Sequence, residues 1–152
     1  MYHRACEAHR IAVVRKVGTP MRVVGRGTKA GGVEGVYTRR STVDYLGWTL
    51  TGRVVAIEAK AVQTEPGGPA SFPLARIKPH QRYELESVMK CGGVAMVALL
   101  FDGVLYAMPW SYVRLVDQSS IARDQIRNWK ANVPLYLAPA LNEQERALQR
   151  AR

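Results

Sequence analysis

Ser41–Lys60 reads STVDYLGWTLTGRVVAIEAK, and this stretch decides the fold. It predicts two strands joined by a turn near TLTGR, because apolar and β-branched residues flank a short polar break. The second strand, RVVAIEAK, begins as an apolar strand but ends with Glu58 and Lys60. A third charged residue, Asp44, lies on the preceding segment. Two carboxylates and a lysine in the middle of a predicted sheet require an explanation.

Side chains alternate across a strand, so Glu58 and Lys60 project from the same face of the predicted sheet. Asp44 lies on the neighbouring strand across a short turn, where its carboxylate can converge with that of Glu58. Converging carboxylates form an oxygen-ligand site for Mg²⁺, and a lysine beside them can orient a water or neutralise charge on a phosphate. The alternative is a structural Glu–Lys pair on a solvated edge strand, which leaves Asp44 unexplained.

The size and composition suit a single globular domain over residues 1–152, with 47% hydrophobic residues. The longest apolar run, VAMVALLF at Val94–Phe101, is far shorter than the ~20 residues of a membrane-spanning helix. The charged start of the chain has no apolar signal core. We therefore expect a cytoplasmic protein with no membrane partner. Two widely spaced cysteines, Cys6 and Cys91, are expected to be free thiols.

The charge distribution favours a polyanionic partner. The chain has a net charge of +10, and residues 1–43 hold nine basic residues against two acidic ones, a balance of +7. Such a field suits nucleic acid. The alternative is a solvated basic surface that has no partner.

The order of the predicted elements favours an α/β fold with a mixed central sheet flanked by helices. Before the strand pair in Ser41–Lys60 we expect a first strand over 9–17 and a basic hairpin over 23–40. After it we expect a loop over 61–74, a helix over 78–93 and two strands within 93–110 that turn at Asp102–Gly103. The chain then continues with a helical stretch over 119–130 and a final helix over 141–152. The hairpin has a Gly-rich centre and few core-forming residues, so we expect it to protrude from the domain.

Asp44, Glu58 and Lys60 form an Asp-x(13)-Glu-x-Lys pattern that resembles the PD-(D/E)xK nuclease motif. The segments STVDY, GRVVAIEAK, FPLARIKPHQ and GGVAMVALLF, in this order, closely resemble the RecU family of Holliday-junction resolvases from about Ile11 to Phe101. The resemblance implies a restriction-endonuclease-like fold. It also implies a Mg²⁺-dependent endonuclease, with Mn²⁺ able to substitute, that cuts four-way DNA junctions. Two symmetric nicks per junction imply a homodimer with twofold symmetry.

By this resemblance, Asp44, Glu58 and Lys60 match the metal-binding and catalytic triad, and the carbonyl of Ala59 is a further metal ligand. Gln81, in KPHQ, matches the polar residue on the following helix and would position water or phosphate. Helical spacing independently turns Gln81 toward the sheet. The alternative is that Gln81 is a core residue bonded to the backbone.

The hairpin over 23–40 matches the position of the stalk that RecU-like proteins direct toward the junction. The predicted DNA-binding residues are Arg22, Arg26, Lys29, Arg39, Arg40, Lys78 and Arg82. The aromatic residues that could form an apolar dimer surface are Trp48, Tyr106, Trp110 and Trp129.

One difference from the family pattern concerns an acidic residue on an N-terminal helix. In this sequence Glu7 is the only acidic residue before the first predicted strand. It is too close to Ile11 to be counted among the ligands. Either that acidic residue is dispensable, or the chain is a trimmed version such as a compact phage-encoded form. Two other functions compete with junction resolution: a duplex or flap endonuclease on the same fold, and a non-catalytic nucleic-acid-binding protein. The intact triad argues against the second of these.

Overall fold

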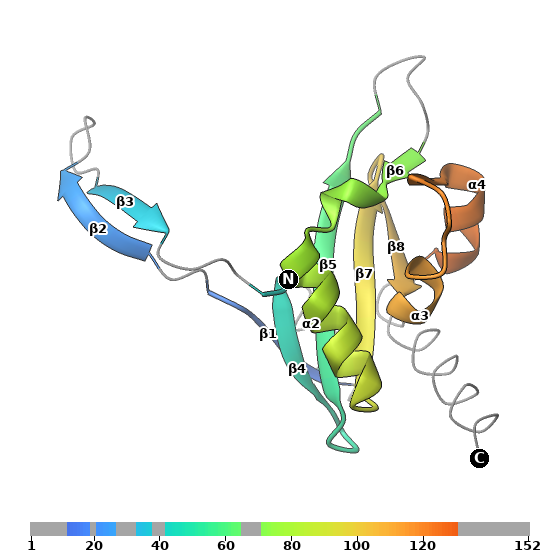
Figure 1. Ribbon diagram of the computed structural model, residues 1–152, viewed down its shortest axis with the longest axis horizontal. Helices are drawn as coiled ribbons and strands as arrows, with labels where there is room; N and C mark the ends of the chain where they lie inside the picture. The colour runs from blue at the N-terminus through green and yellow to red at the C-terminus, as the bar shows by residue number, and fades with distance from the viewer. Residues whose placement is uncertain (1–11, 19–20, 27–32, 38–41, 65–70, 131–152) are drawn as a thin grey trace.

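The chain folds around a five-stranded mixed sheet (Figure 1). The computed structural model describes residues 12–18, 21–26, 33–37, 42–64 and 71–130. In spatial order the strands of the sheet are β1 (Ala12–Lys16), β4 (Tyr45–Thr49), β5 (Val54–Val62), β7 (Val94–Phe101) and β8 (Val104–Pro109). The two strands predicted within Ser41–Lys60 are β4 and β5, so this part of the prediction is confirmed.

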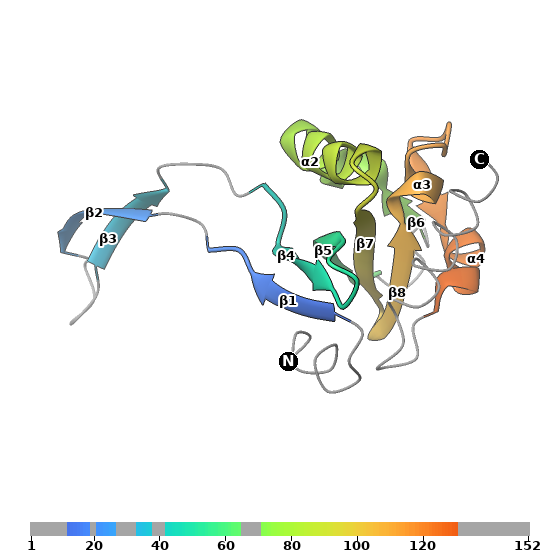
Figure 2. The same cartoon turned by 90° about the horizontal axis from the view of Figure 1, so that it is seen from below.

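Strands β5 and β7 pair in parallel, whereas the other neighbouring strands of the sheet are antiparallel. Parallel neighbours need a long crossover, which here contains β6 (Ser71–Pro73), the short 3-10 helix η1 (Leu74–Arg76) and α2 (Pro79–Lys90). Helix α2 lies across one face of the sheet over β5 and β7 (Figure 2). This mixed sheet flanked by helices is compatible with a restriction-endonuclease-like fold, as the resemblance implied.

Helix α2 begins and ends where its sequence predicts. Pro79 occupies the first helical position, where its missing N–H costs no hydrogen bond. Beyond Cys91, Gly92 adopts a φ of +76°, a conformation that favours glycine. Leu85 and Val88 are buried against the sheet, so α2 presents a defined face to β5.

The turn between β7 and β8 is the predicted Asp102–Gly103 pair. Both residues have positive φ, 47° and 78° respectively, as a two-residue hairpin turn of this type requires. The side chain of Asp102 accepts hydrogen bonds from the N–H and the hydroxyl of Thr64, each at 2.9 Å. These bonds hold the pKa of Asp102 below its usual range and tie the end of β5 to the turn.

Apolar residues are buried on both faces of the sheet. The cluster on the α2 side contains Tyr106 and Trp110, which are 5% and 4% exposed. These two residues are therefore not available as a dimer surface, which corrects that expectation. Trp129 packs partly buried against the same cluster, and Trp48 is 56% exposed. Trp48 is thus the only one of the four aromatic candidates that the structure leaves largely exposed.

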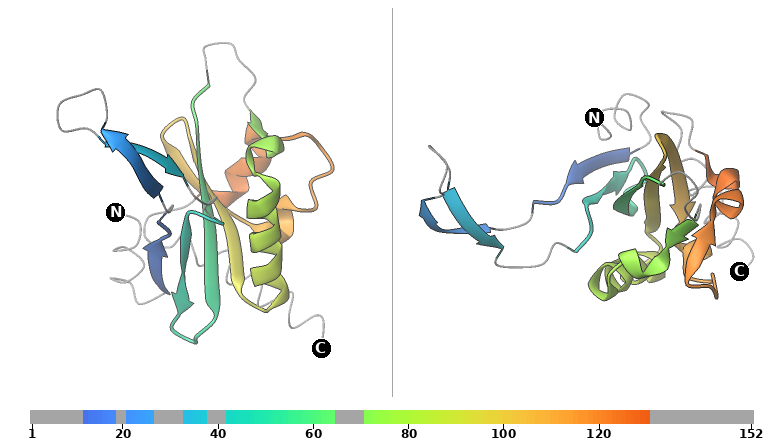
Figure 3. Two further views of the ribbon diagram at one scale, coloured as in Figure 1. Left: turned by 60° about the vertical axis from the view of Figure 1, so that its left-hand side comes forward. Right: turned by 90° about the horizontal axis from the view of Figure 1, so that it is seen from above.

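The predicted protruding hairpin is confirmed. Strands β2 (Met21–Arg26) and β3 (Val33–Tyr37) form a separate antiparallel two-stranded sheet. This hairpin projects away from the central sheet, beyond β1 and β4 (Figures 1 and 3). Strand β2 begins at Met21, two residues before the 23–40 range assigned to the stalk.

The segment after β8 differs from its prediction. It contains α3 (Trp110–Val113), β9 (Ser120–Ala122), α4 (Arg123–Ile126) and the 3-10 helix η2 (Arg127–Trp129). The stretch over 119–130 is helical only from Arg123, because β9 pairs with β6 and places Ile121 opposite Phe72 in the core. The same pairing makes the end of the predicted 61–74 loop a strand. The predicted final helix lies outside the described residues.

Strands β1 and β4 are in close contact at Gly47. A Cβ atom on Gly47 would lie 1.9 Å from the carbonyl oxygen of Val13, so no other residue fits without moving the strands apart. The close approach fixes the spacing between β1 and β4, the strand that Asp44 directly precedes. Among the described residues, no helix is long and apolar enough to cross a membrane.

Candidate active site

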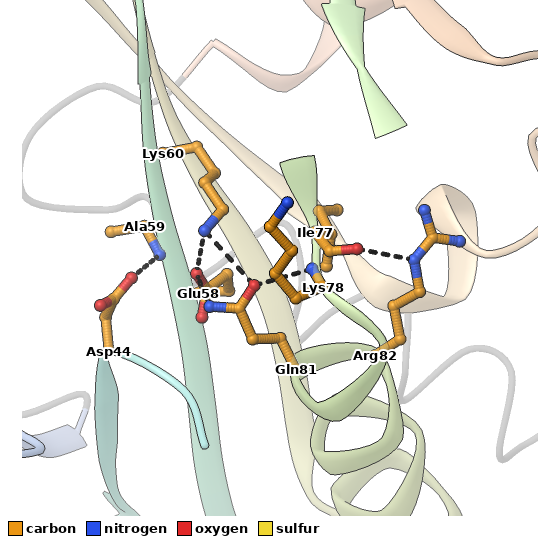
Figure 4. Close-up of polar contacts among 8 residues, drawn as sticks. All are labelled: Asp44, Glu58, Ala59, Lys60, Ile77, Lys78, Gln81 and Arg82. Atoms are coloured by element: carbon orange, nitrogen blue, oxygen red, sulfur yellow. Dashed lines mark hydrogen bonds and ion pairs between the residues drawn. The ribbon is translucent and has the colours of Figure 1, made fainter. Parts of the chain in front are cut away.

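Glu58 and Lys60 project from β5 toward α2, as the strand alternation predicted (Figure 4). Strand β5 lies between β4 and β7, which places Glu58 in the interior of the sheet, where it is fully buried. The Lys60 side chain is 16% exposed, because it lies nearer the end of the strand. The pair is therefore on an inner strand, not on the solvated edge strand of the structural alternative.

Asp44 lies immediately before β4 and is held against β5. Its Oδ2 accepts a hydrogen bond from the backbone N–H of Ala59 at 2.9 Å. Ala59 follows Glu58 directly, so this bond brings the two carboxylates to the same place on the sheet. The negative charge of Asp44 acts on Glu58, where it favours the protonated form.

The two oxygens of the Glu58 carboxylate have different surroundings. Oε1 accepts hydrogen bonds from Nζ of Lys60 and, at 2.6 Å, from Nε2 of Gln81. Oε2 is buried and has no hydrogen-bond partner. Burial raises the pKa of Glu58 to about 7, and the hydrogen bond and charge of Lys60 oppose this rise. The charge of Asp44 adds to the rise, and so does a hydrogen bond between the Glu58 and Asp44 side chains, which requires a proton and is lost when both carboxylates are ionised.

Gln81 lies in the first turn of α2 and points toward the sheet, as its helical position predicted. Its amide oxygen accepts the backbone N–H of Lys78 at 2.9 Å and lies 3.4 Å from Nζ of Lys60. Gln81 thus bonds to the backbone, as the alternative supposed, and at the same time to Glu58. Its assigned role with water or phosphate stays a prediction.

The arrangement fits a divalent metal ion. A buried carboxylate oxygen without a partner is costly unless a proton or a cation compensates it. The unpartnered Oε2 of Glu58 lies in the field of a second carboxylate, and oxygen ligands of this kind are those that Mg²⁺ prefers. Glu7, which the sequence left open as an acidic candidate, lies outside the described residues.

The predicted DNA-binding residues do not share one environment. Arg22 is exposed on β2, and Lys78 is exposed at the start of α2. Arg26 ends β2, while Lys29, Arg39 and Arg40 lie outside the described residues.

Arg82 differs from the others because it is half-buried and its guanidinium donates to backbone carbonyls. Sequence reasoning missed this inward orientation. The residue type alone did not predict this orientation. The carbonyls that Arg82 contacts belong to η1 and the residues after it, and without that segment the same arginine would be exposed on the helix.

The chain matches known proteins over most of its length. A family model described as Recombination protein U matches residues 3–142. Among curated proteins, the Holliday junction resolvase RecU of Listeria innocua serovar 6a is 29% identical over 148 residues, covering 89% of this chain and 71% of that protein. The protein of the same name from Bacillus pumilus is 31% identical over 127 residues, covering 76% of this chain and 60% of that protein.

The mixed sheet, with two carboxylates and a lysine gathered at β5, has the layout of a restriction-endonuclease-like nuclease. Within that class, the match over residues 3–142 decides the family. The chain belongs to the RecU family.

Proposed function

We propose that the chain is a Mg²⁺-dependent endonuclease that resolves four-way DNA junctions by two symmetric nicks. As a RecU family member it is an endonuclease that acts on DNA. The name of its relatives, Holliday junction resolvase, supports junction DNA as the substrate. The observation that carries the metal dependence is the buried Glu58 carboxylate, whose Oε2 has no partner although Asp44 lies beside it.

The ion, Mg²⁺ or Mn²⁺, would be held by the carboxylates of Asp44 and Glu58 and by the backbone carbonyl of Ala59. When bound, it supplies a Lewis acid that activates water and neutralises phosphate charge. A protonated Glu58 is a poor ligand for a cation, so a pKa near 7 links loss of its proton to metal binding.

Lys60 would stabilise the negative charge that develops on the phosphate as the phosphodiester bond is hydrolysed. Its ammonium group is fixed by Oε1 of Glu58, and its side chain is mostly buried. A cation held in place in a partly desolvated site stabilises such charge more than a mobile, hydrated one. In our proposal Lys60 also orients the attacking water, while Gln81 positions water or phosphate.

Junction geometry implies a homodimer. Two equivalent nicks need two equivalent sites, which a twofold-symmetric dimer provides. In this proposal the basic β2–β3 hairpin of each subunit contacts phosphates near the branch point, and Arg22 on β2 is exposed for that purpose. Lys78, exposed at the start of α2 beside the site, would contact the strand that is cut.

The deciding experiment incubates the protein with labelled four-way junction and matched linear duplex, in Mg²⁺ or in chelator. We expect Mg²⁺-dependent, paired nicks in the junction and little cutting of the duplex. Equal cutting of both DNAs would favour a duplex endonuclease instead. Binding without any cutting in Mg²⁺ or Mn²⁺ would favour a non-catalytic DNA-binding protein. Glu58→Gln serves as the matched inactive control.

A further inference from the structure

The guanidinium of Arg82 is bonded to the backbone that leads into α2, although the sequence predicted that it contacts DNA (Figure 4). Its Nε donates to the carbonyl of Ile77 at 2.9 Å, and its Nη2 donates to the carbonyl of Leu74 at 2.6 Å. The backbone N–H of Arg82 also donates to the carbonyl of Lys78 at 3.0 Å. One residue thus binds the backbone at three points of the segment that leads into the helix.

The peptide group between Ile77 and Lys78 connects Arg82 to the candidate active site. Its C=O accepts the Arg82 hydrogen bond, and its N–H donates to Oε1 of Gln81 at 2.9 Å. A trans peptide group is planar, so holding the C=O also fixes the direction of the N–H on its opposite side. A cation bonded to the C=O also polarises the peptide, which strengthens its N–H as a donor.

Gln81 continues this chain of hydrogen bonds to Glu58. An N–H donor from Lys78 requires the amide oxygen of Gln81, so the amide NH₂ must face the other way. That NH₂ donates to Oε1 of Glu58 at 2.6 Å. With Lys60 bonded to the same oxygen, Oε2 is left as the carboxylate oxygen without a partner.

We infer that Arg82 is a positioning residue for the metal-binding carboxylate. It holds the Ile77–Lys78 peptide, this peptide orients Gln81, and Gln81 together with Lys60 occupies Oε1 so that Oε2 of Glu58 stays available to the metal. Arg82 touches neither the metal nor the DNA in this role. The inference rests on the proposed metal-dependent function, which the experiment tests separately.

The test measures metal affinity without DNA. Mn²⁺ is titrated into the protein, and the free ion is followed by its electron paramagnetic resonance signal. Arg82→Ala should weaken Mn²⁺ binding by roughly tenfold, the lower end of the loss seen when a partner of a metal ligand is removed. Arg76→Ala is the matched control, because Arg76 is an exposed arginine of η1 in the same segment. Its Mn²⁺ affinity should equal that of the wild type.

A double-mutant cycle distinguishes this role from general stabilisation of the fold. Gln81→Met keeps the side-chain length but cannot pass on a hydrogen bond, so it should weaken Mn²⁺ binding by itself. Adding Arg82→Ala to Gln81→Met should then cause no further loss. Full additivity of the two losses would overturn the inference, since Arg82 would then act on the site independently of Gln81.

The remaining outcomes also decide the matter. Suppose that the folded Arg82→Ala protein binds Mn²⁺ as tightly as the wild type, and that the slope of log DNA affinity against log salt becomes shallower by about one. Arg82 would then be a phosphate contact, and the inference would be wrong. If Arg82→Ala does not fold, Arg82→Met replaces it, because methionine keeps the apolar stem of the side chain but donates no hydrogen bond to the carbonyls of Ile77 and Leu74. Wild-type Mn²⁺ affinity in Arg82→Met would contradict the inference. Absence of Mn²⁺ binding by the wild type would instead refute the proposed metal-dependent function.

Discussion

Asp44 accepts the backbone N–H of Ala59 through Oδ2 at 2.9 Å, so the carboxylate that precedes β4 is tied to the strand that carries Glu58. An amide oxygen can accept the same bond. Replacing Asp44 by asparagine therefore removes its charge with little change in geometry.

Asp44→Asn should abolish Mg²⁺-dependent cleavage while junction binding stays intact or becomes tighter. The charge that would bind the metal is lost, and so is a charge that would repel phosphate. Cleavage and electrophoretic binding assays on the same labelled junction measure the two effects. Asp117→Asn, at an exposed carboxylate, is the matched control and should cut normally. Robust cleavage by the Asp44 variant would remove Asp44 from the site.

Glu58→Gln should stabilise the metal-free fold at high pH. In the native state the pKa of Glu58 is raised to about 7 from an ordinary value of 4.5, so the native state binds more protons between these values. Stability therefore falls as pH rises through this window and stays reduced above it, by roughly 3 kcal/mol. The glutamine variant has no charge to bury, and its amide oxygen can still accept from Lys60.

The measurement is urea unfolding in chelator between pH 5 and pH 8. The stability difference between Glu58→Gln and wild type should be small at pH 5 and should grow until about pH 7. Glu84→Gln, at a half-buried position of α2, is the control for loss of a carboxylate elsewhere. Parallel pH profiles of wild type and Glu58→Gln would show that Glu58 titrates normally.

Arg39→Ala combined with Arg40→Ala should flatten the salt dependence of junction binding. Each phosphate neutralised contributes a slope of about −0.9 in log affinity against log salt, so two lost contacts change the slope by about one to two. Affinities measured at several salt concentrations give the slope. The single Arg127→Ala variant, exposed on η2, should leave it unchanged. An unchanged slope in the double variant would place the DNA surface elsewhere.

Replacing residues 25–35 of the β2–β3 hairpin by a short turn should leave the fold intact, because the hairpin forms its own small sheet. The variant should lose its preference for four-way junctions over linear duplex through weaker junction binding. Competitive binding of the two DNAs measures this preference, and the melting temperature controls for folding. If a normally melting variant still prefers junctions to the same degree, selectivity must come from the spacing of the two sites in a dimer.

The elements with a strong local signal could be predicted from the sequence. The alternation in RVVAIEAK placed Glu58 and Lys60 on one face, and Asp102–Gly103 specified its own turn. Strand β9 could not be predicted in this way, because its residues suit a helix and only the pairing of Ile121 with Phe72 makes them a strand.

The same limit applies to the candidate site. The short turn between neighbouring strands brought Asp44 and Glu58 together, and helical spacing turned Gln81 toward the sheet. The place of Gln81 in the site came from the resemblance to the RecU family. The unpartnered oxygen of Glu58 and the inward guanidinium of Arg82 depend on tertiary contacts that no local pattern encodes.

The parallel pairing of β5 with β7 affects the order in which the site assembles during folding. Asp44 and Glu58 approach each other through the local β4–β5 hairpin. Gln81 is separated from Glu58 by 23 positions and reaches it only after the crossover has folded back over the sheet. Contacts that close long loops form late, because the loop entropy must be overcome first. A nascent or partly unfolded chain therefore gathers its two acids before it gains Gln81, so the hydrogen bond from Gln81 to Glu58 is a feature of the completely folded molecule.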